Sequence, residues 1–251
     1  MKSIGIVCEG PTDYILLQSV TDHVLEDNNN YKLLQPEPNL MGEYGNGWKG
    51  VWKWCADNAL IKEQIMKEIE PRLDFLIVQM DGDVSRKERI SHCWCDSNTC
   101  EFKGNRNPLD CDSMGTNARQ DCPLTLPCAD HERSVEGYQK HLKLLITGLL
   151  KDLENTCVVI PCDSTDAWIV AAYDKMNHIE RIENPWETLI SKGKYYHGLR
   201  IHGKKKQTLT YREMSTTVCD NWEEVKKLCT SAACFESDII RLAATHTGEL
   251  E

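Results

Sequence analysis

Short apolar runs alternate along the chain with stretches of helical periodicity. Strands buried on both faces lack a polar side, so such runs are typical of a parallel sheet. Strands alternating with helices also favour a parallel sheet with right-handed crossovers. We therefore expect an α/β fold built on a small Rossmann-like parallel sheet. The predicted strands are residues 4–8, about 31–36, 74–80 and 156–160, and the predicted helices are 13–27, about 50–69, 133–151 and 165–176.

Acidic residues follow two of these predicted strands. Asp81 and Asp83 come directly after the run DFLIVQM, and Glu9 follows the run IGIVC. The carboxyl ends of parallel strands form the edge at which open α/β sheets bind their ligands. Carboxylates this close repel one another unless a cation lies between them, and their oxygen atoms suit Mg²⁺ or Mn²⁺. For residues 81–83 alone, a solvated Asp-Gly-Asp turn is the alternative interpretation.

Three short motifs together resemble one family. They are EGPTD at 9–13, DGD at 81–83 and STDAW at 164–168. In this order they resemble the Toprim domain of topoisomerases, primases and OLD-type nucleases, over about residues 1–175. The first motif is similar to the E-G-x-[ST]-[DE] variant of small bacterial Toprim proteins. The third resembles an S-x-E-A-W element, with Asp166 where relatives often carry Glu.

The resemblance implies a Toprim core that hydrolyses phosphodiester bonds of DNA or RNA with Mg²⁺ or Mn²⁺. Glu9 would do general acid/base work and bind the metal together with Asp81 and Asp83. Asp13 and Asp166 would bind a second metal ion or orient the first. Similar small proteins act in bacterial anti-phage defence beside an ATPase, and OLD-type nucleases often form homodimers. Two alternatives stay open: a non-catalytic Toprim-like module that binds a partner, and a small-molecule phosphoesterase.

A basic segment near the C-terminus is a candidate nucleic-acid-binding region. Residues 189–212 contain seven Lys and Arg and no acid, although the whole chain has a net charge of −10. Cations neutralise phosphates, and the interleaved Tyr and His rings can stack on bases. A solvated basic loop is the alternative. Lys204 or Lys205 is a candidate to stabilise transition-state charge. The candidate binding residues are Lys194, Arg200, Lys204, Lys205 and Lys206.

Cysteines gather in the segment 86–131, which interrupts the predicted core. It holds six of the chain's 13 cysteines and has neither helical nor strand periodicity. A reducing cytoplasm disfavours disulfides, so a structural Zn²⁺ bound by a subset of these residues is expected. Reduced thiols without a metal are the alternative. The candidate ligands are Cys93, Cys95, Cys100, Cys111, Cys122, Cys128 and His131.

The predicted organisation has a core at 1–176, interrupted by the Cys-rich insertion, and a C-terminal α-rich appendage at 177–251. The appendage carries the basic segment and predicted helices at 220–230 and 236–246. No apolar run approaches the length that spans a membrane, and the first residues do not form a signal peptide. We therefore expect a cytoplasmic protein without a membrane partner. The sequence contains no P-loop, so any ATP-driven control would need a partner chain.

Overall fold

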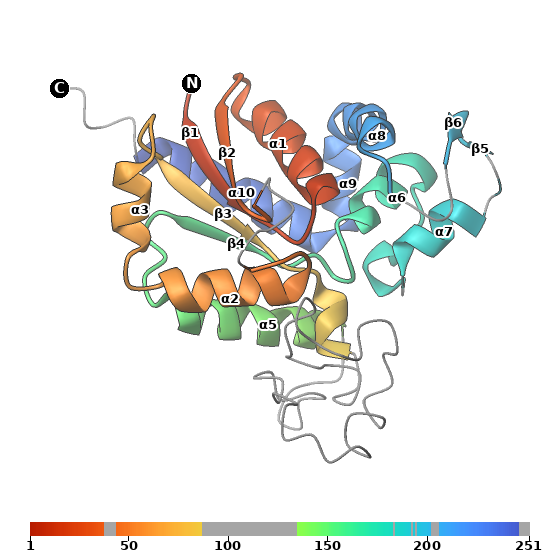
Figure 1. The fold of residues 1–251 in the computed structure, drawn as a ribbon. Coiled ribbons are helices and arrows are strands. Elements are labelled where there is room, and N and C mark those ends of the chain that lie inside the picture. Colours follow the sequence, from red (N-terminus) through yellow and green to blue (C-terminus); the bar gives the residue numbers. More distant parts are fainter. Residues whose placement is uncertain are drawn as a thin grey trace, which may run out of the picture.

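Four parallel strands form the central sheet of the computed structural model (Figure 1). Their order is β2-β1-β3-β4, and their bounds agree with the predicted strands to within one residue at each end. The strands are β1 (Ser3–Val7), β2 (Asn30–Gln35), β3 (Phe75–Gln79) and β4 (Thr156–Val159). The structure confirms the predicted α/β class with a parallel sheet. It describes residues 1–37, 44–86, 135–182, 184–191, 193, 195–201 and 206–245.

Helices cover both faces of the sheet, which gives three layers (Figure 1). One face packs against α2 (Trp48–Asn58), α3 (Lys62–Glu68) and α5 (Val135–Leu150). The other packs against α1 (Pro11–Leu25), α6 (Asp166–Asp174) and three C-terminal helices. The helix predicted at 50–69 is thus two helices. The chain turns before α3 and buries Lys62, whose Nζ donates to Thr156 Oγ1 at the start of β4 (3.1 Å).

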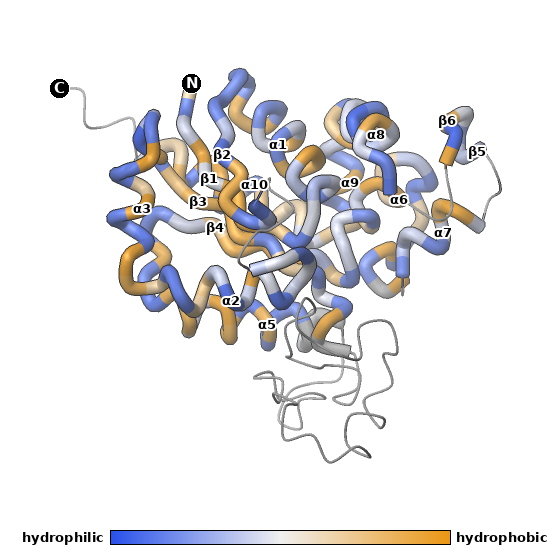
Figure 2. The backbone as a smooth tube through the Cα atoms, viewed as in Figure 1, coloured by the Kyte–Doolittle hydropathy of each residue, from blue (hydrophilic) through white to orange (hydrophobic). Residues whose placement is uncertain are grey.

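Each strand supplies apolar side chains to both layers. The strands are largely hydrophobic along their length, as the colours in Figure 2 show. In β3, Phe75 and Ile77 belong to the hydrophobic cluster beneath α1, whereas Leu76 and Val78 belong to the cluster beneath α2. All four side chains are fully buried. Alternation of side chains between faces explains why the strand has no polar side.

The described part of the C-terminal region is α-rich, as predicted, but it forms one layer of the core. It comprises α8 (Thr208–Asp220), α9 (Trp222–Leu228) and α10 (Thr230–Thr245). Helix α8 packs on α1 and α6, and α10 packs on β4 and α1. Buried Met214 and Phe235 belong to the same hydrophobic cluster as Ile4 of β1. This packing differs from the appendage expected from the sequence, because these helices share one hydrophobic cluster with the sheet, α1 and α6.

Smaller elements connect α6 to α8. They are the 3-10 turn η3 (Ile179–Arg181), helix α7 (Pro185–Ser191) and a hairpin of β5 (Tyr195–Tyr196) with β6 (Leu199–Arg200). A further 3-10 turn, η1 (Gly82–Arg86), follows β3. Beyond Arg86 the predicted Cys-rich insertion lies outside the described residues. Among the helices of the described part, none is long and apolar enough to cross a membrane.

Candidate active site

Glu9 and Asp81 meet where β1 and β3 end. The backbone N–H of Asp81 donates to Glu9 Oε1 (2.7 Å). Gln79, the last residue of β3, links the two: its Oε1 accepts from the backbone N–H of Glu9 (3.1 Å), and its Nε2 donates to Asp81 Oδ1 (2.7 Å). Because β1 and β3 are neighbouring parallel strands, their ends lie side by side, and the Gln79 carboxamide holds both acids at that edge.

Gly82 allows the DGD motif to lie against the turn that follows β4. A Cβ on Gly82 would lie 2.2 Å from the carbonyl oxygen of Cys162 and 2.4 Å from that of Pro161, so the position accommodates only glycine. The Gly82 N–H donates to Pro161 O (3.1 Å), and the Asp83 N–H donates to Asp163 O (3.1 Å). Asp83 therefore lies between the ends of β3 and β4.

Asp13 and Asp166 come from the first turns of two helices. Asp13 belongs to α1, is 5% exposed, and accepts a hydrogen bond from Thr165 Oγ1 (2.6 Å). Thr165 is the N-cap of α6, and Asp166 is the first residue of that helix. The positive end of each helix dipole favours a carboxylate at this place. The Asp13–Thr165 bond joins the starts of α1 and α6 at the same edge of the sheet.

Lys206 brings a positive charge to this group of acids. Asp166 is fully buried and accepts hydrogen bonds from Lys206 Nζ (2.7 Å), from Ser164 Oγ (3.2 Å) and from the Tyr211 hydroxyl. The Lys206 ammonium also lies 5.7 Å from the centre of the Trp186 ring, which stacks on Tyr211. The Lys206 side chain is 34% exposed. It is held by a carboxylate and an aromatic ring while part of it remains in contact with solvent.

Burial and acidic neighbours both act on the described acids at this edge of the sheet. Burial, reinforced by the charges of Glu9 and Asp13, raises the pKa of Asp81 well above its ordinary value. Burial also raises the pKa of Asp13, and the neighbouring Asp166 adds to that rise. Lys206 opposes both shifts without cancelling them. Ionisation of these acids is therefore unfavourable in the isolated chain, and a bound cation would make it favourable.

The donor set fits a hard divalent cation. Every acid at the site offers oxygen atoms, which Mg²⁺ and Mn²⁺ prefer. In the arrangement described, oxygen atoms of Glu9 and Asp13 accept hydrogen bonds from Asp81 N and Thr165 Oγ1. Within the described ranges, no three His, Cys, Asp or Glu side chains form a group that could hold a metal ion as they stand. Metal binding at this site would thus require carboxylates to exchange hydrogen-bond donors for the ion.

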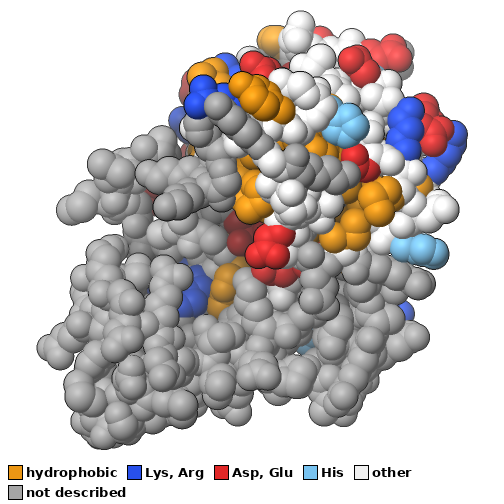
Figure 3. Space-filling view, turned by 90° about the vertical axis from the view of Figure 1, so that its right-hand side faces the viewer, with side chains coloured by type: hydrophobic (Ala, Val, Ile, Leu, Met, Phe, Trp, Pro, Cys, Tyr) orange, Lys and Arg blue, Asp and Glu red, His pale blue; other side chains and the backbone are white. Residues whose placement is uncertain are grey.

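Figure 3 shows acidic side chains near the middle of one face of the molecule. The structure brings five of the predicted site residues together. These are Glu9, Asp13, Asp81, Asp83 and Asp166. Lys206 joins them, whereas Arg200 lies exposed on the β5–β6 hairpin. Other predicted residues lie outside the described part of the chain: Lys194, Lys204 and Lys205, and the candidate zinc ligands Cys93, Cys95, Cys100, Cys111, Cys122, Cys128 and His131.

Sequence reasoning missed four residues that support the site. Gln79 is a fully buried polar residue at the end of an apolar strand, and that contrast is a signal that could have identified it. Thr165 was named only as part of a helix start. Tyr211 on α8 contacts Asp166, and Trp186 on α7 contacts Lys206. Both contacts arise from the packing of helices, so no local sequence pattern predicts them.

Comparisons with known proteins assign no family. The chain matches no protein-family model, no curated protein and no solved structure. The description of the site therefore rests on the geometry and chemistry of the chain's own residues, and the Toprim resemblance stays a prediction.

Proposed function

We propose that the chain is a Mg²⁺- or Mn²⁺-dependent nuclease of the Toprim type that hydrolyses phosphodiester bonds of DNA or RNA. The contact between Glu9 and Asp81, at the adjacent ends of β1 and β3, is the observation that carries this proposal. These acids belong to two of the three motifs that resemble the family, and Asp166 of the third motif lies in the same group of charges.

Glu9, Asp81 and Asp83 would hold the divalent ion, and Asp13 and Asp166 are candidates to hold a second ion or to orient the first. When bound, the ion would polarise the scissile phosphate and lower the pKa of an attacking water. The unfavourable burial of several acids beside one another supports this assignment, because a cation would relieve their repulsion.

Lys206 supports a phosphate as the group that enters the site. Its ammonium is fixed by Asp166 and Trp186, yet the side chain is 34% exposed. It can therefore donate a hydrogen bond to a phosphate oxygen without first being ordered, and can stabilise negative charge in the transition state. We assign to Lys206 the role that the sequence suggested for Lys204 or Lys205, which lie outside the described residues.

Glu9 is the candidate general base, with a water molecule as the nucleophile. Tyr211 is the tyrosine that contacts the site, and its hydroxyl donates to Asp166. Burial, together with the charge of Asp166, raises the pKa of Tyr211 well above its ordinary value. A tyrosine held in this way is a poor nucleophile, so its environment supports hydrolysis over covalent transfer to Tyr211.

The resemblance extends the proposal to cellular role and assembly. We propose an effector of bacterial antiviral defence that acts in the cytoplasm as a homodimer. By the same resemblance an ATPase subunit would be its partner, and any ATP-driven control would come from that subunit, since the sequence has no P-loop. A structural Zn²⁺ in the Cys-rich insertion is also part of the proposal.

A cleavage assay tests the proposed function. Plasmid DNA, single-stranded DNA and total tRNA are incubated with the chain in Mg²⁺, Mn²⁺ or EDTA. We expect metal-dependent cleavage that Glu9→Gln abolishes and Glu213→Gln, an exposed change of the same chemistry on α8, preserves. Hydrolysis of a chromogenic phosphate without cleavage of nucleic acid would indicate a small-molecule phosphoesterase. Stoichiometric zinc without Mg²⁺ binding or cleavage would indicate a partner-binding module.

A further inference from the structure

The β5–β6 hairpin has one face turned into the protein and one turned outward. Tyr195 pairs with Arg200 across the hairpin, and Tyr196 pairs with Leu199. Tyr196 is 1% exposed and belongs to the hydrophobic cluster around α6 and α8, whereas Tyr195 is 58% exposed. Successive side chains of a strand alternate between faces, so Tyr195 and Arg200 lie together on the outward face.

Contacts with the end of α6 hold this hairpin in place. His197 Nε2 lies 2.8 Å from Asp174 Oδ1, and the Asp174 side chain is 7% exposed. The Tyr173 ring lies 5.3 Å from that of Tyr196 and 5.2 Å from that of His197. Positive φ at His197 (47°) and Gly198 (88°) is typical of a tight two-residue hairpin turn. The outward pair is therefore presented on a fixed support.

The distance between the hairpin and the acids can be estimated from the length of α6, which lies between them. Asp166 is its first residue and Asp174 its last. Eight helical steps place these two residues about 12 Å apart. Arg200 and Lys206 are six residues apart in sequence, so their Cα atoms lie within about 21 Å. At 3.4 Å per stacked nucleotide, these two distances correspond to roughly three to six nucleotides between the hairpin and the carboxylates.

We propose that Tyr195 and Arg200 form a binding site for single-stranded nucleic acid. A base stacks on the Tyr195 ring, and the Arg200 guanidinium contacts a neighbouring phosphate. Single strands expose the faces of their bases to such a ring, whereas a duplex buries them between neighbouring base pairs. A strand held here would extend along α6 toward Lys206. The inference rests on the proposed nuclease function and identifies the substrate class as single-stranded.

Binding measured in EDTA at low ionic strength tests this site without cleavage. The probe is a fluorescent single strand of about 15 nucleotides, compared with a duplex of the same sequence by anisotropy. We expect the single strand to bind more tightly, Tyr195→Leu to weaken its binding about 10-fold, and Tyr195→Trp to restore it. Arg200→Gln should also weaken binding, whereas Arg241→Gln, an exposed arginine on α10, should not.

Three results would overturn the inference: equal affinity for single strand and duplex, unchanged affinity in Tyr195→Leu, or no nucleic-acid binding at all. Unchanged thermal unfolding of Tyr195→Leu serves as the control for folding, because the side chain is exposed. Tyr195-dependent binding without cleavage in Mg²⁺ would support the hairpin site and refute the nuclease. Cleavage that is unaffected by Tyr195→Leu would support the nuclease and refute the hairpin site.

Discussion

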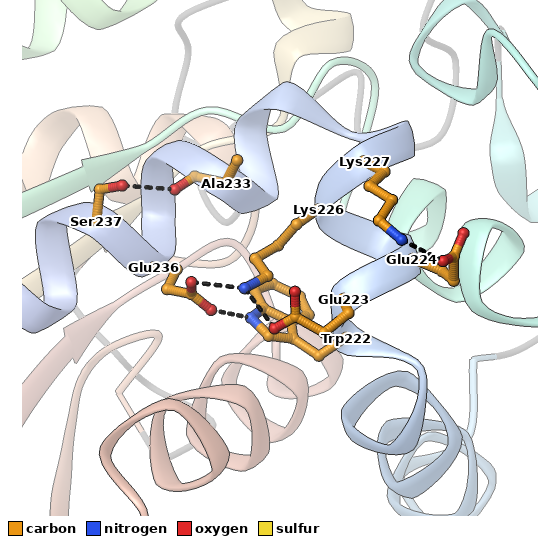
Figure 4. Close-up of polar contacts among 8 residues, drawn as sticks. All are labelled: Trp222, Glu223, Glu224, Lys226, Lys227, Ala233, Glu236 and Ser237. Carbon is orange, nitrogen blue, oxygen red and sulfur yellow. Dashed lines mark hydrogen bonds and ion pairs between the residues drawn. The ribbon is translucent and has the colours of Figure 1, made fainter.

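Two groups of charged side chains in this protein differ in how their charges are balanced. Between α9 and α10, Lys226 Nζ lies 2.7 Å from carboxylate oxygens of both Glu223 and Glu236 (Figure 4). At the ends of β1 and β3, several acids lie together, and Lys206 forms an ion pair with Asp166. In the first group, one lysine contacts both neighbouring glutamates, whereas in the second, within the described residues, the direct ion pair of Lys206 is with Asp166.

The directions of the pKa shifts show in which group the folded protein favours ionised carboxylates. Lys227, through its hydrogen bond and its charge, lowers the pKa of Glu224 on α9. Burial and neighbouring acids raise the pKa of Asp81. A lowered carboxylate pKa means that the ionised group is favoured in the folded protein, and a raised pKa means that it is disfavoured. Ionised Glu224 is thus stable in the isolated chain. Ionised Asp81, at the end of β3, would be stabilised by a bound cation.

The largest expected effect is on activity. Asp81→Asn removes a carboxylate while keeping an oxygen that can accept from Gln79. We expect nucleic-acid cleavage in Mg²⁺ to fall by at least about 100-fold, because metal binding and charge organisation are lost together. Initial rates compared with the exposed control Asp57→Asn measure this effect. Full activity in Asp81→Asn would contradict a catalytic role for the acids at the ends of β1 and β3, which the charged residues of α9 and α10 do not have.

Mg²⁺ should stabilise the protein through the strand-end acids. At a concentration near 100 times Kd, binding adds about 2.7 kcal/mol to the free energy of unfolding. That corresponds to a rise in Tm of roughly 5–10 °C for a chain of this size. Thermal unfolding should show the rise in wild type and Glu236→Gln but not in Asp81→Asn. An equal rise in all three would place the ion elsewhere.

Removal of Lys206 should cost more stability than removal of a lysine from the α9 pair. Lys206→Met leaves the fully buried Asp166 without its cation and should lower the free energy of unfolding by about 2 kcal/mol in EDTA. Lys227→Met breaks an exposed pair, which solvent screens, and should cost far less than Lys206→Met. Urea unfolding measures both, and equal costs would contradict the account.

Asp81→Asn should stabilise the folded chain when no cation is present. The raised pKa of Asp81 means that the folded state binds this proton more tightly than the unfolded state does. The free energy of unfolding therefore falls as pH rises above about 4, the pKa of an unfolded Asp. In EDTA the variant should therefore be more stable than wild type at pH 7, and the difference should disappear near pH 4, where an unfolded Asp is protonated. If the variant were less stable than wild type at pH 7, the ionised Asp81 carboxylate would be shown to stabilise the folded chain, against this prediction.

A modest effect on stability, with none on activity, is expected between α9 and α10. Glu236 accepts from Trp222 Nε1 (2.6 Å) and from Lys226 Nζ (2.7 Å), and Glu236→Gln weakens both bonds (Figure 4). We expect a loss of about 0.5–1 kcal/mol in urea unfolding, with activity unchanged. Activity loss in this variant would mean that these helices influence the site.

Strand positions and the meeting of the acids could be predicted from the sequence. Residues 75–79 are all buried, so both faces of the strand are covered. A continuous apolar run of this length is typical of such a parallel strand. Once β1 and β3 are neighbours, the acids that follow them must share an edge. The glycine at position 82 has a steric explanation, because a side chain there would collide with the turn after β4.

Partners of Asp166 could not be predicted, because they depend on tertiary packing. Lys206 reaches Asp166 because it lies two residues before the start of α8, a boundary that the run of lysines in the sequence does not reveal. Tyr211 reaches the same carboxylate because α8 packs on α6. The single helix predicted at 50–69 failed for a similar reason: the turn that buries Lys62 against β4 interrupts a continuous helical pattern.

Calorimetric titration of Mg²⁺ into the EDTA-treated chain tests the central claim most directly, because it requires neither a substrate nor a partner. The account predicts saturable binding in wild type and in Asp57→Asn, and loss of that binding in Asp81→Asn. Absence of binding in wild type, or undiminished binding in Asp81→Asn, would contradict the claim that the acids at the ends of β1 and β3 form a cation site.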